Sequence, residues 1–267
     1  MRGLGDPKER QGQGLTVIEG RRLVAEALGA GVTLRLVLYT PDLAEHPDGM
    51  SLLEQAAARG ARLICVSPEA LEACAQTVTP QGLAAVAELA ERPLARDELA
   101  SPRGGLASPG GMVLALDGVQ DPGNVGTIVR AALAADARGV LLGPGTAELT
   151  SPKTLRASAG TAFRVRAWRL GNWDVLAELK ARGWRVLATG GRGGIPPWEV
   201  DLCSGVVILL GNEARGLSPG LAEMAEARIS IPMPGGAESL NVAMAGTILL
   251  YESVRQMGVV PPREPVI

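Results

Sequence analysis

VVILLGNEARGLSPGLAEMAEARISIPMPGGAESLNVAMAGTILLYE, residues 206–252, contains two apolar runs that each end in a loop rich in Gly or Pro. The runs at 206–210 and 227–231 have the composition of buried strands, and the second loop leads into a long apolar helix. Open α/β sheets bind ligands at the carboxyl ends of their strands. We therefore expect a functional site in these two loops, which hold Asn212, Glu213, Ser239 and Asn241.

The composition bounds the class of protein. The chain has 267 residues, 46% of them hydrophobic, a formal net charge of −2 and only 3% aromatic residues, so stacking platforms for single-stranded nucleic acid are scarce. No apolar run approaches the roughly 20 residues of a membrane span, and the first residues lack the apolar segment of a signal peptide. The three cysteines have no metal-like spacing. We expect a cytoplasmic protein with no membrane or metal partner.

Histidine usage excludes several chemistries. The only histidine is His46, which lies in the polar segment PDLAEHPDGM, and none follows it. Ser-His-Asp and Cys-His nucleophilic sites are therefore excluded from the second half of the chain, as are zinc sites with His ligands. The catalytic chemistry expected near residues 206–252 must use other side chains.

The order of predicted elements indicates two α/β domains. In the first domain we expect helices at 17–31, 51–60 and 68–76, with strands at 33–40, 61–67 and 82–89, in a small three-layer arrangement. In the second we expect helices at 125–136, 152–160, 173–182, 218–226 and 239–257. Its strands, near-continuous apolar runs that favour a parallel sheet covered on both faces, are expected at 112–118, 139–143, 163–168, 184–190, 205–211 and 227–232.

These elements divide the chain into five segments. A stretch of Pro and Gly interrupts the pattern and is interpreted as an interdomain linker, and the charged, Gly-rich start of the chain is interpreted as a flexible tail. The predicted division is a tail at 1–14, a first domain at 15–92, a linker at 93–111, a second domain at 112–258 and a C-terminal tail at 259–267.

The first strand of the second domain ends in DGVQDPGNVGTIVRAALAADA, residues 117–137. Asn124 is suited to cap the helix that follows, which would leave backbone N–H groups free for an anion, and Arg130 lies in the second turn of that helix. The alternative is a capped core helix with a surface arginine. The nucleotide signatures GxGxxG and GxxxxGK[ST] are missing, and the loops GPGTAE and GGRGGIPP match neither, so any nucleotide-like cofactor must bind in an unusual way.

Three stretches, DPGNVGTIVRAA, LLGNEARGL and IPMPGGAESLNVAMAGTILLYE, resemble in order and spacing the three motifs of the SpoU/TrmH family of RNA ribose 2′-O-methyltransferases, of the SPOUT superfamily. Between them, SPKTLRASAGTAFRV is similar to the family's connecting helix, with Ser151, Arg156, Ser158 and Gly160 in the expected places. The resemblance covers about residues 112–255. The first domain more loosely resembles the L30e-like domain that many members carry, and members with that domain mostly act on ribosomal RNA.

The resemblance implies a fold, a cofactor and a reaction. The second domain would be a parallel-sheet α/β knot, a deep trefoil knot, preceded by a smaller L30e-like α/β/α domain that binds the RNA substrate. S-adenosyl-L-methionine (AdoMet) would lie bent in the knot, in a pocket lined by Gly211, Ile231 and Leu240. The reaction would transfer its methyl group to a ribose 2′-hydroxyl of 23S rRNA, and the enzyme would act as a homodimer. The alternatives are a tRNA 2′-O-methyltransferase and a non-catalytic RNA-binding ribosome factor.

The resemblance also implies roles for single residues. Arg130 corresponds to the arginine proposed as the general base, but arginine keeps its proton, so holding the target phosphate or the nascent alkoxide is an equal alternative. Asn124, Glu213, Ser239 and Asn241 would fix the ribose, Arg130 and the cofactor by hydrogen bonds. Glu213 could instead cap the helix near 218 or pair with Arg215, and Ser239 could cap the last helix. The helix face of Val242, Ala245 and Leu249 is the expected dimer contact.

Overall fold

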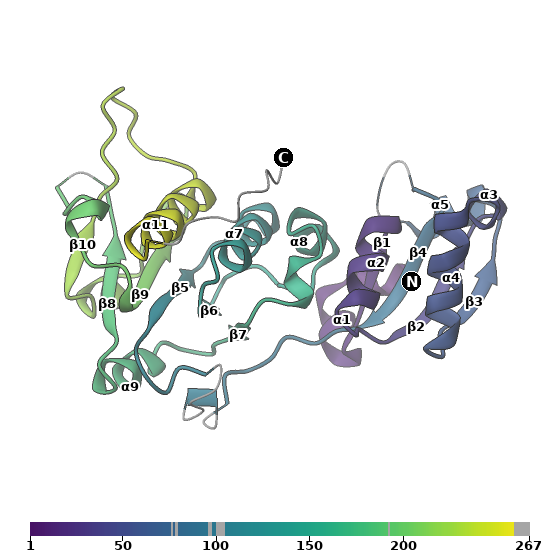
Figure 1. Cartoon of the computed structure of the whole chain (residues 1–267), viewed down its shortest axis with the longest axis horizontal. Coiled ribbons are helices and arrows are strands. Elements are labelled where there is room, and N and C mark those ends of the chain that lie inside the picture. The colour runs from purple at the N-terminus through teal and green to yellow at the C-terminus, as the bar shows by residue number, and fades with distance from the viewer. Residues whose placement is uncertain (76, 78–79, 96–97, 100–104, 192, 259–267) are drawn as a thin grey trace.

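The computed structural model describes residues 1–75, 77, 80–95, 98–99, 105–191 and 193–258. They form two β-sheets that lie side by side, each covered by helices (Figure 1). The four-stranded sheet belongs to the N-terminal domain (residues 1–88) and the six-stranded sheet to the C-terminal domain (residues 105–258). The predicted C-terminal tail, 259–267, and part of the predicted linker lie outside the described residues.

The N-terminal sheet has the strand order β1-β4-β2-β3, with β2 and β3 parallel and the other two pairs antiparallel. Along β4, Ala85 and Ala87 pack in the cluster that contains α2 and α4, whereas Ala84 and Val86 pack with η1 and α5 on the other face. This alternation gives the three layers that the sequence predicts. The elements are η1 (Arg2–Gly5), α1 (Pro7–Gln13), β1 (Leu15–Glu19), α2 (Arg21–Gly29), β2 (Leu34–Tyr39), α3 (Pro41–Glu45), α4 (Pro47–Ala58), β3 (Arg62–Cys65), α5 (Pro68–Cys74) and β4 (Leu83–Glu88).

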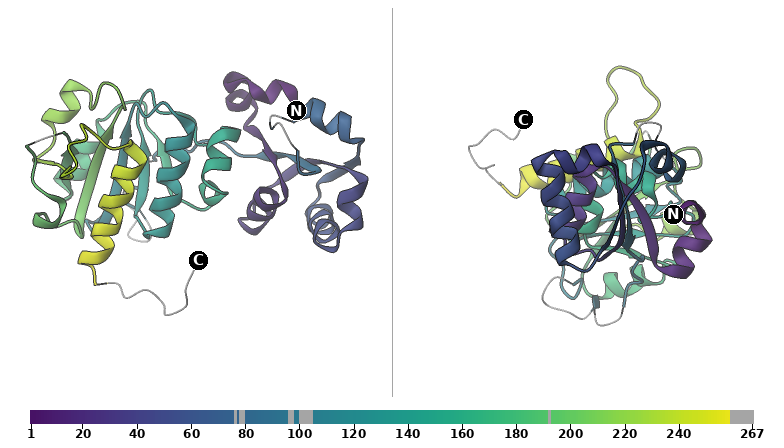
Figure 2. Two further views of the ribbon diagram at one scale, coloured as in Figure 1. Left: turned by 90° about the horizontal axis from the view of Figure 1, so that it is seen from above. Right: turned by 90° about the vertical axis from the view of Figure 1, so that its right-hand side faces the viewer.

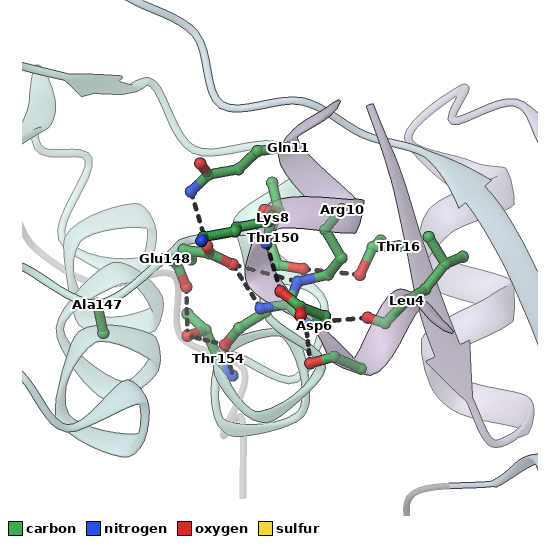
Figure 3. Close-up of polar contacts among 12 residues, drawn as sticks. Leu4, Asp6, Lys8, Arg10, Gln11, Thr16, Ala147, Glu148, Thr150 and Thr154 are labelled. Carbon is green, nitrogen blue, oxygen red and sulfur yellow. Dashed lines mark hydrogen bonds and ion pairs between the residues drawn. The ribbon is translucent and has the colours of Figure 1, made fainter. Parts of the chain in front are cut away.

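The start of the chain differs from the prediction in two places. Residues 17–19, the first three of the helix predicted at 17–31, belong to β1 instead, and Gly20 with φ of 90° turns the chain into α2. The predicted flexible tail, 1–14, contains η1 and α1, whose N-cap Asp6 accepts a hydrogen bond from Lys8 N. The Arg10 side chain is buried and bonded to the C-terminal domain (Figure 3). Its partner lies 138 residues away, so local composition could not predict this order.

The C-terminal sheet has the order β10-β8-β9-β5-β6-β7, and all five strand pairs are parallel, as the sequence predicts. Helices α7 and α11 pack on one face with Leu114 and Leu116 of β5, and α9 and α10 pack on the other with Val113 and Ala115 (Figures 1 and 2). The strands are β5 (Gly111–Asp117), β6 (Gly139–Leu142), β7 (Ala167–Arg169), β8 (Arg185–Thr189), β9 (Ser204–Gly211) and β10 (Ala227–Ile229). The helices are α7 (Pro122–Ala134), α8 (Pro152–Ala157), η2 (Thr161–Phe163), α9 (Val175–Ala181), η3 (Pro197–Glu199), α10 (Pro219–Glu223) and α11 (Val242–Gln256).

The described part of the predicted linker packs on the C-terminal sheet. Pro93 bridges to Arg169 at the end of β7, so the chain extends the edge of the sheet there. Leu99 and Leu106 are buried in the cluster under α9, and Trp184 Nε1 donates a hydrogen bond to Leu106 O at 3.1 Å. These residues act as a cover for one face of the sheet as well as a connection.

The helix face predicted to contact a second molecule, that of Val242, Ala245 and Leu249, is covered within the chain. Helix α11 begins at Val242 rather than 239, with Asn241 as its N-cap. Val242 and Leu249 are buried inside the chain, and Ala245 lines a cavity, so that face is not free to contact a second molecule. The exposed apolar side chains of the helix lie on another face: Met244, Ile248 and Tyr251. Within the described residues, no helix is both long and apolar enough to cross a membrane.

Candidate active site

A cavity of about 710 Å³ opens at the carboxyl ends of β8, β9 and β10. Its lining residues fall in three segments, 189–196, 210–217 and 229–249, which are the loops after these strands and the first turns of α11. The carboxyl ends of parallel strands meet at one edge of a sheet, so these segments converge in space. The cavity therefore lies where the sequence predicts a site, and its volume is that of a small-molecule pocket.

The three residues predicted to contact a cofactor all line this cavity. Gly211 ends β9, Ile231 follows β10 and Leu240 precedes α11. A Cβ atom at Gly211 would lie 2.4 Å from the backbone of Gly216 and Leu217, so only glycine fits there. The wall at this point is consequently built from backbone, which presents N–H and C=O groups rather than side chains.

Asn212 shapes the loop after β9. Its backbone N–H and C=O pair with those of Gly216 at 2.9 Å each, and its Oδ1 accepts hydrogen bonds from the backbone N–H groups of Ala214 and Arg215 at 3.0 Å. Its Nδ2 donates to Gly118 O at 2.8 Å, which ties the loop to the end of β5. This closed turn fixes the backbone of Glu213, the next residue.

A chain of side-chain hydrogen bonds joins three of the predicted site residues. Asn124 Nδ2 donates to Glu213 Oε1 at 2.8 Å, and Asn124 Oδ1 accepts from Asn241 Nδ2 at 2.9 Å. Asn241 Oδ1 in turn accepts from the backbone N–H groups of Ala243 and Met244 at the start of α11. Each amide donates with its nitrogen and accepts with its oxygen, so the orientation of both amides is fixed. The three residues come from three separate motifs of the sequence.

The helix caps differ from the prediction. Asp121, not Asn124, is the N-cap of α7, and its side chain accepts a hydrogen bond from Asn124 N. A hydrogen bond from Lys153 Nζ holds the pKa of the Asp121 carboxyl below its usual value. Asn241, not Ser239, caps α11, because residues 235–239 are not helical. Ser239 lies in the exposed loop that lines the cavity.

The alternatives proposed for Glu213 are wrong in this structure. The N-cap of α10 is Ser218, with no side-chain cap hydrogen bond, and among the described residues Glu213 forms no ion pair with Arg215. The partner of its carboxylate is Asn124. Glu213 thus belongs to the hydrogen-bonded chain beside the cavity.

Arg130 is the predicted residue that the structure does not bring into this group. It lies on α7, one turn beyond Gly126, and its side chain is exposed. Among the described residues it has no hydrogen bond or ion pair, and it is not part of the cavity wall. An exposed guanidinium without a carboxylate partner can bind a phosphate of a ligand that spans α7 and the cavity.

Two features of the site were missed by sequence reasoning. The loop after β8 contributes four glycines to the cavity wall, although its irregular GGRGGIPP pattern matches no known signature. Asp117, at the end of β5, is buried and accepts hydrogen bonds from Ser218 N at 2.7 Å and from Trp173 Nε1 at 3.3 Å. The sequence signal that could have identified Asp117 is a carboxylate at the last position of a buried apolar strand. Asp117 positions the start of α10 rather than lining the cavity.

Fold and site together define a class: an α/β protein with a helix-covered parallel sheet and a ligand-sized cavity between the loops of three strands. The comparison with known families makes the assignment specific. Residues 111–251 match the SpoU rRNA Methylase family, and residues 1–85 match the MRM3-like substrate binding domain. The chain belongs to the SpoU rRNA methylase family, so the family predicted from the three motifs is confirmed.

Individual relatives cover nearly the whole chain. The 23S rRNA (guanosine(2553)-2′-O)-methyltransferase RlmP of Bacillus subtilis is 36% identical over 91% of this chain and 90% of its own length. A solved structure of an AdoMet-bound rRNA methyltransferase from Sinorhizobium meliloti is 32% identical, covers 96% of this chain and 93% of that chain, and superposes with a TM-score of 0.82. A structure from work on 2-OH methylation of C/U34 on tRNA, 32% identical with a TM-score of 0.50, covers only 57% of this chain but 99% of its own.

Proposed function

We propose that this chain transfers a methyl group from AdoMet to a ribose 2′-hydroxyl of 23S rRNA. The observation that carries the proposal is the hydrogen-bonded chain Glu213–Asn124–Asn241 at the edge of the cavity. It aligns polar groups from the three family motifs beside a pocket large enough for a nucleoside. The names of the RlmP relative and of the Sinorhizobium meliloti structure support the same reaction and cofactor.

The residues that line the cavity suit AdoMet in their chemistry. Gly211, Ile231 and Leu240 line the cavity in which an adenine and a ribose would lie, and the apolar side chains of Leu210 and Leu249 line the same cavity. The glycines after β8 leave room close to the backbone. When bound, AdoMet supplies an activated methyl group on a positively charged sulfur. The chain must then align the RNA hydroxyl and stabilise the charge that develops on its oxygen.

The side chains around the cavity can divide this work. The Glu213 carboxylate holds Asn124 in one orientation, and Asn241 completes the chain at the N-terminus of α11, where partial positive charge from the helix is available. Ser239, exposed in the neighbouring loop, can hydrogen-bond the ribose. Arg130 is assigned to the phosphate next to the target ribose or to the nascent alkoxide, because an exposed arginine keeps its proton and is a poor base.

Ribosomal RNA is favoured over tRNA by the N-terminal domain. Residues 1–85 match a substrate binding domain, and the 23S rRNA relative aligns with 91% of this chain. The tRNA-related structure aligns with 57% of it. A non-catalytic RNA-binding factor is disfavoured because Asn124, Arg130, Glu213 and Asn241 are all present and three of them are hydrogen-bonded together.

The same proposal includes a knot, a dimer and a location. The C-terminal domain would form the deep trefoil knot of the family, with an L30e-like domain ahead of it, in a cytoplasmic protein. Met244, Ile248 and Tyr251 lie at helical spacing and are 57%, 41% and 52% exposed, and an apolar stripe of this kind is suited to a homodimer contact. A monomeric mass in light scattering would contradict the dimer. The predicted domain bounds, 15–92 and 112–258, stay a proposal; the packing of Leu4 on the first sheet and of Leu106 on the second favours including residues 1–14 and 105–111 as well.

The experiment that tests the proposed function is methyl transfer from labelled AdoMet to purified 23S rRNA and, separately, to tRNA. Transfer to a 2′-hydroxyl of 23S rRNA is expected, and transfer to tRNA alone would replace the rRNA assignment.

Arg130→Lys keeps the charge but loses the planar fork, so it should lose most activity while AdoMet affinity is unchanged. Near-normal turnover of Arg130→Lys would remove Arg130 from the site.

A further inference from the structure

The loop between β6 and α8, residues 143–151, connects the two domains to the candidate active site. One end of the loop carries Glu148 and Thr150, which bond to the N-terminal domain. The two residues directly before Glu148, Thr146 and Ala147, bond to the segment after β5. Figure 3 shows Glu148 pointing toward Arg10 and Gln11 of α1.

The Glu148 carboxylate is held on both oxygens by the N-terminal domain. Oε2 accepts hydrogen bonds from Arg10 Nη2 at 2.6 Å and Nε at 3.1 Å, and Oε1 accepts one from Gln11 Nε2 at 2.7 Å. Arg10 Nη1 donates to the backbone oxygens of Leu4 and Gly5, so the guanidinium is fixed on its own side too. The two side chains are only 6% and 15% exposed. Salt screens such a pair poorly, and removing one partner leaves a buried charge.

Two further contacts hold the domains together near this ion pair. Thr16 Oγ1 of β1, fully buried, donates to Thr150 O at 2.7 Å. Behind it, a Cβ atom at Gly160 would lie 2.6 Å from Cβ of Glu26, and Leu23 is part of the same apolar cluster as α7. The N-terminal domain is therefore packed against the C-terminal domain and not only tethered to it.

Thr146 and Ala147 of the same loop bond to backbone groups of β5 and of the segment that follows it. Thr146 Oγ1 donates to Leu116 O at 2.8 Å and accepts from Gly118 N at 3.1 Å, and Ala147 N donates to Val119 O at 2.9 Å. Gly118 O accepts the hydrogen bond from Asn212 of the cavity loop. The same short loop thus fixes the N-terminal domain and the segment that leads into α7.

We propose that Glu148 is a positioning residue for the methyl transfer: by holding α1 of the substrate-binding domain, it fixes that domain at one orientation relative to the cavity and so determines which ribose of a bound RNA reaches the methyl donor. This inference rests on the proposed function. An RNA held by both domains can present only nucleotides at a set distance from its anchoring point. A domain free to rotate would present many, each for a smaller fraction of time.

Other ion pairs of the chain supply matched controls. Arg35–Glu88 has the same 2.6 Å separation as Arg10–Glu148, but it lies within the N-terminal domain and is exposed. Arg164–Glu26 joins the two domains at 2.9 Å and is more exposed than Arg10–Glu148, with Arg164 exposed and Glu26 partly exposed. If the buried interdomain pair positions the RNA, Glu148→Ala should have a large effect, Glu26→Ala a small one and Glu88→Ala none.

The test uses the full-length chain and three measurements on each variant. Calorimetry gives AdoMet affinity, small-angle scattering gives the domain arrangement, and methyl transfer is measured on intact 23S rRNA and on a short oligonucleotide around the position that the wild type modifies. For Glu148→Ala we expect an increased radius of gyration and kcat/KM on intact rRNA reduced on the order of 10- to 100-fold. AdoMet affinity should be unchanged, and so should the rate on the oligonucleotide, which is chosen too short to reach the N-terminal domain from the cavity.

Each outcome decides the proposal. Equal losses on rRNA and on the oligonucleotide would show a general structural role and overturn it, as would wild-type scattering and rates. If Glu148→Ala does not fold, Glu148→Gln, which keeps the length and one acceptor, should show the same split between the two RNAs at smaller magnitude. If the wild type methylates no RNA, the proposed function fails. The scattering comparison of Glu148→Ala with Glu88→Ala then still decides whether Glu148 fixes the domains.

Discussion

In the C-terminal sheet, the loops at the carboxyl ends of β8, β9 and β10 differ from those at the carboxyl ends of β6 and β7. The loops after β8, β9 and β10 surround an open cavity, and glycines in the loops after β8 and β9 leave backbone exposed in its wall. The loop after β6 and the end of β7 are instead joined by partly buried charged side chains: Arg169 bonds to Glu91 and to the backbone oxygens of Thr146 and Ala147. One half of the sheet is built to accept a ligand and the other to hold a second domain.

This difference shows how one sheet can combine binding and docking. At the glycines of the cavity half no side chain stands between the backbone and a ligand, whereas the side-chain network of the other half uses its donors and acceptors internally. Substitutions in the two halves should therefore fail differently. In the cavity half they should remove ligand affinity or turnover, and in the docking half they should reduce stability or the fixed domain arrangement.

The largest effect is expected at the backbone wall. Gly211→Val would place a branched side chain where even a Cβ atom lies 2.4 Å from the backbone of Gly216 and Leu217. We expect loss of detectable AdoMet binding in calorimetry and a fall in unfolding free energy of about 1–3 kcal/mol. Gly171→Val, at an exposed position with open space around it, serves as the control. AdoMet affinity like that of the wild type would contradict a backbone-built pocket at Gly211.

The next effect is expected in the polar chain beside the cavity. Asn124→Ala removes the hydrogen bonds to Glu213 and Asn241 but leaves the cap of α7 on Asp121. Turnover on rRNA should fall about 10²- to 10³-fold, as for the loss of one preorganised polar group, while AdoMet affinity is retained. Steady-state kinetics with calorimetry separates these quantities. A variant with weak AdoMet binding but normal turnover at saturation would assign Asn124 to the cofactor instead.

Substitutions around the loop after β6 and the end of β7 should lower the free energy of unfolding. Arg169→Lys keeps the charge but loses the fork that bonds Glu91 and the loop carbonyls, so we expect unfolding free energy to fall by about 2–4 kcal/mol in denaturant titrations. AdoMet affinity of the folded fraction should be unchanged. Arg185→Lys, in a 3.8 Å pair that is more than a third exposed, should change stability little. Equal losses of unfolding free energy for the two variants would remove the contrast between the partly buried pair and the exposed pair.

The smallest effect is expected at the Asp121–Lys153 pair, which joins α7 to α8. The pKa of Asp121 is lowered in the folded chain, so its contribution is complete above its unfolded pKa of about 4 and is lost as pH falls through the folded value. The pair is half-exposed, and the contribution should remain below about 1 kcal/mol. Unfolding curves of Asp121→Asn and wild type at pH 3 to 7 check it. A difference that grows as pH falls would have the wrong sign.

Patterns within each segment predicted much of this structure. The six strands of the parallel sheet and the cavity at their carboxyl ends follow from apolar runs and loop residues, and six of the eight predicted site residues line one cavity. Asn124 reaches that cavity only through its hydrogen bonds to Glu213 and Asn241. The N-cap of α11 is Asn241 because the loop continues through residues 235–239. Apolar periodicity does not determine where that loop ends.

Contacts between distant segments explain what could not be predicted. Residues 17–18 fit helical spacing, but they pair with β4 in the sheet. Helix α1 has a favourable cap in Asp6, yet its burial depends on Glu148. The role of the glycines after β8 depends on loops that follow β9 and β10. In each case, a partner far along the chain decides between two local conformations that the sequence allows equally.

The position of β5 has a consequence for synthesis on the ribosome. β5 lies in the middle of the sheet, but one of its neighbours, β9, is made about 90 residues later, since Val113 pairs with Val207. The partner of α1, Glu148, emerges well before β9. A chain grows at roughly 5–20 residues per second, so the two domains can dock seconds before the centre of the sheet closes. The RNA-holding part of the molecule would then be assembled while the cavity for the methyl donor does not yet exist.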